Sequence, residues 1–347
     1  MVKSKKMSNI ELLRILLFLM VICIHSTSVG LVVENGFTFW NTNYKYAMYM
    51  RIFSNCAIMV FVLISGFLLG KKEISLRKYW AKILSPFLLY LPMILFGYYF
   101  IIMQHDILQI VDDFFKFGGY FYHLWYIVVL LLFSLFIPYV NKILNAINQK
   151  QHFKLSIICI AATSFTFTIK NYFSYDMFSI LASDRLALFF CLYIVGAYIG
   201  KYGIKLNRYI AILGYLAFVT AIYSYAYKSK LKLVEIPFLN YSDLTCILMA
   251  ICLFTFFVKL NFSNKFINFI GDKTYGAYII HVIYLSLLQK HFTLFKYFQI
   301  NNYFLYDIAY IFIIFTLSIL TETARQGVIQ LYKSFKQKSN VGVTSGH

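Results

Sequence analysis

Arg14 and His25 lie in the first long apolar run of the chain, where an ionisable side chain is costly and therefore usually functional. They are eleven positions apart, and eleven residues of helix rotate about 20° more than three full turns. On a helix both side chains would therefore point to one side, roughly 16 Å apart along the axis. Glu11 falls on that side as well. Histidine can act as a base at neutral pH, and arginine is a permanent cation that binds oxyanions in pairs of hydrogen bonds. The spacing predicts a functional site along one side of a membrane helix.

A simpler interpretation assigns these residues no chemistry. Arg14 would extend to the lipid headgroups, and Glu11 would close a capping box with Ser8 at the start of the helix. His25 would then mark the opposite membrane interface. We favour the functional interpretation for Arg14 and His25, whereas the two roles of Glu11 remain open.

A second group of residues follows the second apolar run. Ser65 and Gly66 lie near the end of that run, and small residues allow a ligand or another helix backbone to approach closely. Arg77, Lys78 and Lys82 come before the next run, with Lys78 and Lys82 on one face of a helix. This face could hold a polyphosphate at the membrane surface. Helix packing for the small residues and simple membrane anchoring for the basic ones remain alternatives.

The composition indicates an all-α, polytopic bundle of transmembrane helices. Hydrophobic residues make up 61% of the 347 residues and charged residues only 13%, and the apolar stretches are about 18 to 20 residues long, as a bilayer requires. We expect about ten spans in a membrane domain over residues 1–325, followed by a polar cytoplasmic tail over 326–347. The expected spans are 9–28, 51–70, 83–103, 123–140, 155–173, 185–200, 209–227, 243–258, 274–291 and 304–323.

The distribution of basic residues predicts the orientation. With these spans, 21 of the 32 lysines and arginines fall at the termini and in the even-numbered loops, which places both termini in the cytoplasm. Lys228, Lys230 and Lys232 are exceptions on the outer side. Orientation and contact with anionic membrane lipids explain the net charge of +19, so we expect no nucleic-acid partner.

The six cysteines lie within or at the edges of apolar runs, without a C-x-x-C pair or a histidine at ligand spacing. We expect small packing residues there and no metal site. The usage of Lys, Ile, Asn, Tyr and Phe indicates a bacterial protein, and the hydrophobic spans place it as a multi-pass protein of the plasma (inner) membrane.

Five segments, in order, resemble the acyltransferase-3 family of integral membrane acyltransferases. They are Arg14 with His25, FVLISGFLLG at 61–70, YHLWY at 122–126, FFCLYIVGAYIG at 189–200 and IGDKTYGAYIIH at 270–281. The resemblance covers about residues 8–325. Within the family, the chain is most similar to short members that acetylate envelope polysaccharides, such as the enterobacterial common antigen O-acetyltransferase.

The resemblance implies an O-acyltransferase that moves an acetyl or other short acyl group from acetyl-CoA to a cell-envelope glycan or lipid-linked sugar. His25 would be the base, with Arg14 and Glu11 beside it. Arg14 would also contact the donor, together with the small and basic residues after the second apolar run.

The same resemblance suggests an acceptor site. His123 and Trp125 would bind the sugar at the outer end of the fourth span, although Trp125 could equally be an interfacial residue. Tyr278 and His281 share one face of the ninth span and would support the site. A transporter or exporter of an envelope polysaccharide, with ionisable residues along its path, is the alternative function.

Overall fold

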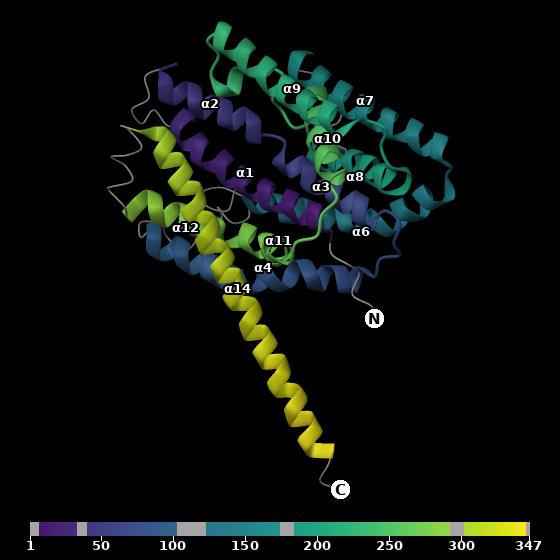
Figure 1. Ribbon diagram of the computed structural model, residues 1–347, viewed down its shortest axis with the longest axis vertical. Coiled ribbons are helices and arrows are strands. Elements are labelled where there is room, and N and C mark those ends of the chain that lie inside the picture. Colours follow the sequence, from purple (N-terminus) through teal and green to yellow (C-terminus); the bar gives the residue numbers. More distant parts are fainter. Residues whose placement is uncertain (1–6, 33–39, 103–122, 174–183, 292–301, 345–347) are drawn as a thin grey trace.

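The computed structural model describes residues 7–32, 40–102, 123–173, 184–291 and 302–344, and every element in these ranges is helical (Figure 1). The all-α prediction is therefore confirmed. The helices are α1 (Ser8–Val32), α2 (Thr42–Ser54), α3 (Ala57–Leu69), α4 (Leu76–Ile102), α6 (Trp125–Ala146), α7 (Gln149–Phe173), α8 (Asp184–Tyr202), α9 (Arg208–Lys228), the 3-10 turn η2 (Leu233–Glu235), α10 (Leu244–Val258), α11 (Lys265–Gly271), α12 (Thr274–His291) and α14 (Tyr303–Thr344).

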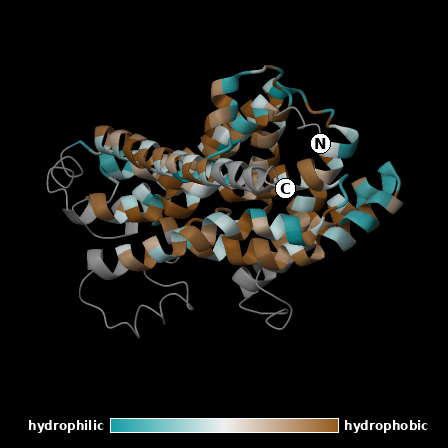
Figure 2. Cartoon of the chain, turned by 90° about the horizontal axis from the view of Figure 1, so that it is seen from below, coloured by the Kyte–Doolittle hydropathy of each residue, from teal (hydrophilic) through white to brown (hydrophobic). Residues whose placement is uncertain are grey.

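Seven stretches of helix are long and apolar enough to cross a membrane, and α10 and α12 are shorter apolar helices. Hydrophobic residues follow the helices along much of their length, and hydrophilic residues gather at several helix ends (Figure 2). The chain is thus a helical membrane protein. Each of the ten expected spans overlaps an observed helix, but the number of helices that cross the bilayer and the orientation of the termini stay predictions.

The second expected span differs from the observed structure. The observed helical segment starts at Thr42 and is broken between α2 and α3 at Asn55 and Cys56. The amide of Asn55 donates to the Leu239 carbonyl at 2.6 Å and its oxygen accepts from Arg51 at 2.6 Å. A polar side chain that is buried and hydrogen-bonded to another segment therefore occupies the break.

Helices α3 and α8 pack through glycines. A Cβ added to Gly66 would clash with the backbone of Tyr193, and one added to Gly196 would clash with the backbone of Leu63. Gly70 and Gly200 extend the same contact by one turn. Small residues four apart on both helices let the two backbones touch, which favours association in lipid.

The last expected span, 304–323, is part of a much longer helix. α14 continues to Thr344, so the expected polar tail at 326–347 is helical as far as the structure describes it. Figure 1 shows this helix projecting from the body of the protein.

Candidate active site

Three histidines from three helices meet inside the bundle. His25 comes from α1, His123 from the turn before α6, and His281 from α12. The ring of His281 stacks on that of His25, with centroids 5.4 Å apart, and meets His123 edge-on at 5.5 Å. The structure therefore brings together three predicted site residues that are far apart in the sequence.

Backbone carbonyls fix how two of these imidazoles are protonated. Nδ1 of His281 lies 2.5 Å from the Tyr278 carbonyl and Nε2 of His123 lies 3.2 Å from that of Ile279. A carbonyl only accepts, so these nitrogens carry the protons in the neutral rings. The other nitrogen of His281, Nε2, is buried and has no hydrogen-bond partner among the described residues. A basic lone pair thus lies inside the cluster.

Tyr278 links the segment that carries His123 to α12. Its hydroxyl donates to the His123 carbonyl at 2.8 Å, and its ring lies 5.5 Å from that of His281 and 5.6 Å from that of Tyr126. Tyr278 and His281 share one face of α12, as expected from their spacing. The tyrosine therefore fixes the start of α6 against α12.

The three histidines differ in exposure. His281 is 0% exposed and His123 is 2% exposed, whereas His25 is only half-buried. Of the three rings, His25 therefore presents the most surface to a substrate, and the other two lie behind it.

Arg14 and Glu11 form an ion pair on α1, with 2.9 Å between Nη1 and Oε1. Ser8 does not close the predicted capping box, because the N–H of Glu11 donates to the Met7 carbonyl at 3.0 Å, while the Ser8 hydroxyl accepts from the N–H of Asn264 and donates to Asn268, at 2.9 Å each. Glu11 packs against Gly271, where a larger residue would clash with it. The structure thus gives Glu11 the role of orienting Arg14, one of the two that the sequence left open.

Tyr126 connects Arg14 to the histidine cluster. It lies close enough to interact electrostatically with Arg14 and with Tyr79 of α4, while its ring touches that of Tyr278. Tyr126 therefore lies between Arg14 and the histidine cluster inside the bundle.

The proposed donor residues divide into two groups. Arg77, Lys78 and Lys82 are exposed on the first turns of α4, so they lie at that end of the bundle and are not gathered around the histidines. Gly66 is covered by α8, and the hydroxyl of Ser65 donates to the Phe61 carbonyl at 3.0 Å within its own helix. Gly66 therefore serves helix packing, the alternative that the sequence left open.

Trp125 follows directly after the histidine cluster along the chain. The guanidinium of Arg185 lies 4.2 Å from the centre of its ring, and the ring stacks with Tyr241 at 6.4 Å. Trp125 is half-buried, so part of its ring remains accessible beside these two side chains.

Sequence reasoning did not single out Arg51, which lies near His25. It interacts electrostatically with His25 and Cys23, and Cys23 in turn lies against the Met50 carbonyl. Nε of Arg51 is buried without a hydrogen-bond partner among the described residues. Its place at the start of an apolar run was a signal that the sequence contained.

Asp307 was also missed. It is 0% exposed on α14 and accepts hydrogen bonds from Ser26 at 2.5 Å and Tyr46 at 3.3 Å. These contacts fix α1 directly after His25 against α2 and α14. A carboxylate inside the last apolar run was again the available signal.

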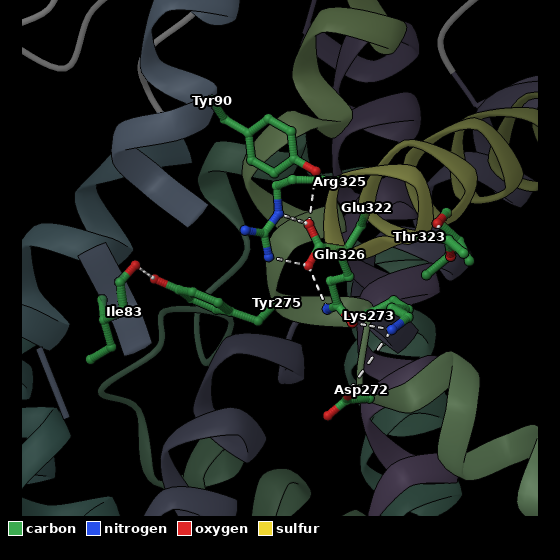
Figure 3. A network of polar contacts seen from close by, with 10 residues as sticks. Ile83, Tyr90, Asp272, Lys273, Tyr275, Glu322, Thr323, Arg325 and Gln326 are labelled. Carbon is green, nitrogen blue, oxygen red and sulfur yellow. Dashed lines mark hydrogen bonds and ion pairs between the residues drawn. The ribbon is translucent and has the colours of Figure 1, made fainter. Parts of the chain in front are cut away.

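A buried polar network fixes α12, the helix that carries His281. The carboxylate of Glu322 on α14 accepts two hydrogen bonds from Arg325 at 2.6 Å each and one from Tyr90 of α4 at 2.7 Å (Figure 3). Gly276 of α12 leaves the space that this carboxylate fills. Lys273, at the start of α12, donates to Gln326. The network therefore joins α4, α12 and α14.

Within the described part of the chain, no three His, Cys, Asp or Glu side chains converge as metal ligands would. The six cysteines are unpaired. His281 stacks on His25 and meets His123 edge-on, so the three imidazoles are held by ring contacts and by the backbone carbonyls described above.

Comparison with known proteins decides the family. Residues 7–323 match an acyltransferase domain, that of the acyltransferase-3 family. The chain belongs to this family. Searches of curated proteins and of solved structures found no match. As the match covers nearly the whole chain, this acyltransferase-3 protein is a membrane acyltransferase.

Proposed function

We propose that this acyltransferase moves an acetyl or other short acyl group from cytoplasmic acyl-CoA to a hydroxyl of a cell-envelope polysaccharide or its lipid-linked precursor. His25 acts as the base. The observation that carries this proposal is the contrast within the histidine cluster, where His25 keeps accessible surface while His281 and His123 are buried behind it.

In the proposed step, the acceptor hydroxyl attacks the thioester carbonyl while His25 takes the hydroxyl proton. The new C–O bond forms, the C–S bond breaks, and the thiolate of CoA leaves and recovers a proton. Negative charge develops on the carbonyl oxygen, and a cation in a dry site stabilises such charge strongly. Arg51, which interacts electrostatically with His25, is the cation we assign to this task.

The donor would enter from the cytoplasmic end of the bundle, where Arg77, Lys78 and Lys82 bind its nucleotide phosphates. Arg14, held by Glu11, would contact the pantetheine or a phosphate closer to the thioester. In this orientation both termini lie in the cytoplasm of the cell whose plasma (inner) membrane holds the protein. The separation of Arg14 from His25 on one helix suits an extended donor.

The acceptor would reach His25 from the other end. Trp125 is half-buried beside Arg185 and Tyr241, and the accessible part of its ring would contact the sugar. His123, Tyr278 and His281 are buried, so their contribution is to hold and polarise His25.

Labelled acetyl-CoA tests this function. Membranes that contain the protein are incubated with it, and the envelope glycan is isolated. We expect label in the glycan with the wild-type protein and none with membranes that lack it. If no label enters the glycan while its export depends on this protein, the transporter function is correct instead.

A further inference from the structure

Two lysines converge on one tyrosine where α2 starts and α9 ends. The Nζ atom of Lys230 lies 4.1 Å from the centre of the Tyr227 ring, and that of Lys45 lies 5.2 Å from it. Lys230 is also 5.4 Å from the ring of Trp40, and Tyr223 stacks parallel to Tyr227 at 6.2 Å. We name these five residues the lysine–tyrosine platform. They come from two helices that contact each other (Figure 1) and from the segments beside them.

The backbone is left-handed at two residues of the platform. Trp40 has a φ of 59° and Lys230 a φ of 52°, a left-handed conformation that costs non-glycine residues about 1 kcal/mol or more. These two residues come from distant parts of the chain, yet their side chains approach each other. At Lys230 this conformation is a common helix end, because the N–H of Leu231 donates to the Ala226 carbonyl at 3.0 Å and closes α9. The turn carries Lys230 back over the ring of Tyr227, and this fixed placement of a cation gives a first reason to expect a ligand here.

The charge of the platform gives a second reason. Among the residues that the structure describes, neither Lys45 nor Lys230 pairs with a carboxylate. The nearby Glu235 accepts the backbone N–H of Lys232 at 2.7 Å and forms no ion pair with either lysine among the described residues. Two like charges on one ring repel each other, and an anion beside them would offset this repulsion.

The position of the platform gives a third reason to expect a ligand. Lys45 is on α2 and lies before Met50, which is level with Cys23 near His25. The platform is thus at the His25 end of the bundle, opposite the basic start of α4. The positive-inside rule does not explain three basic residues at this end, Lys228, Lys230 and Lys232. Another role for them is therefore needed.

We propose that the lysine–tyrosine platform binds an anionic sugar unit of the acceptor glycan. The ammonium groups of Lys45 and Lys230 hold its carboxylate or phosphate, and the exposed edge of Tyr227 packs against its ring. This inference rests on the proposed function in one respect, namely that the acceptor approaches His25 from this end. It narrows the acceptor to acidic glycans.

Binding of defined oligosaccharides to the full-length protein in detergent tests this site. The probes are tetragalacturonate and its neutral counterpart, tetragalactose. We expect the acidic probe to bind about tenfold more tightly at low salt, and this preference to shrink as salt is added. Equal binding of the two probes, or no binding of the acidic one, would overturn the assignment.

Single-charge variants locate the site. Lys230→Gln and Lys45→Gln should each weaken tetragalacturonate binding about three- to fivefold and leave the neutral probe unchanged. Lys228→Gln is the matched control, because Lys228 is exposed on the same segment but contacts neither platform ring, and it should change binding less than twofold. Equal losses at Lys228 and Lys230 would mean an unspecific basic surface and refute the platform.

A lipid phosphate could supply the same anionic chemistry. Vesicles of phosphatidylglycerol and of phosphatidylcholine are therefore compared with the same variants. If Lys230→Gln weakens binding to phosphatidylglycerol and not to tetragalacturonate, the ligand is a lipid headgroup and the glycan assignment is wrong. Acetyl transfer is measured separately, so a protein that prefers the acidic probe but transfers no acetyl group refutes the proposed function alone.

Discussion

His25 and His281 have the same side chain but different surroundings, and this difference separates their roles. His281 is fully buried and donates from Nδ1 to a backbone carbonyl, so its ring cannot turn. His25 stacks on that fixed ring and keeps accessible surface. A base must reach the proton it removes, which points to His25 as the reacting residue and to His281 as its support.

Arg14 should matter more for the donor than for the acceptor. Replacing it with alanine removes a cation that the neighbouring Glu11 orients, so KM for acetyl-CoA should rise about tenfold, which corresponds to about 1.4 kcal/mol of lost binding. Arg14→Lys should keep part of the effect, because it retains the charge and loses the bidentate geometry. Steady-state kinetics with each substrate varied in turn measures both. A rise in the acceptor KM alone would contradict this assignment.

The elements that position the site depend on close helix packing. A Cβ added at Gly196 on α8 would clash with the Leu63 carbonyl oxygen on α3, so Gly196→Ala forces the two helices apart. We expect a loss of about 1–3 kcal/mol, the usual cost of overpacking, seen as a lower Tm in detergent. Gly327→Ala is the control, because an added Cβ there meets no atom within 4 Å. An unchanged Tm for Gly196→Ala would show that α3 and α8 do not need this contact.

His152 makes the junction of α7 and α8 sensitive to acid. Its Nε2 donates to the Ile194 carbonyl at 3.0 Å, and burial lowers the pKa of its imidazole below the ordinary 6.5. The unfolded chain then binds more protons than the folded one below pH 6.5, so stability falls as the pH drops from 6.5 toward the lowered pKa.

Thermal unfolding at pH 7.5 and pH 5.5 tests this dependence. The wild-type protein should have a lower Tm at pH 5.5. His152→Gln can still donate to Ile194 but does not titrate, so the difference in Tm between the two pH values should shrink. The same difference in both proteins would exclude His152 as its source.

The sequence predicted the helices well because apolar runs of membrane length have few alternatives. It could not predict the break at Asn55, because that residue's partners, Leu239 and Cys246, are far away in the chain. For the same reason it identified His25, His123 and His281 singly but not their contact. Gly66 shows why a local sequence pattern could not decide between two roles, because a glycine allows the close approach of a ligand and of another helix equally.

The whole molecule has two chemically different ends. One carries Arg77, Lys78 and Lys82 on α4 and the projecting α14, and the other carries His25, Trp125 and the lysine–tyrosine platform. The proposed function requires this separation, because it places the charged donor and the glycan acceptor on opposite sides of the membrane.

The orientation can be measured directly by cysteine labelling. In a background without the native cysteines, Lys72→Cys and Lys228→Cys are placed at exposed positions at the two ends. A maleimide that cannot cross membranes should label Lys228→Cys on intact cells and Lys72→Cys only after the membrane is opened. The reverse pattern would show that the termini face outward and would remove the cytoplasmic donor site.

The most direct test of the account is the rate of acetyl transfer by His25→Ala, compared with the wild-type protein at equal folded amounts and matched Tm. Loss of a general base should lower the rate about 10²- to 10⁴-fold while acetyl-CoA still binds. A rate within twofold of wild type, with glycan labelled as before, would contradict His25 as the base and with it the proposed site.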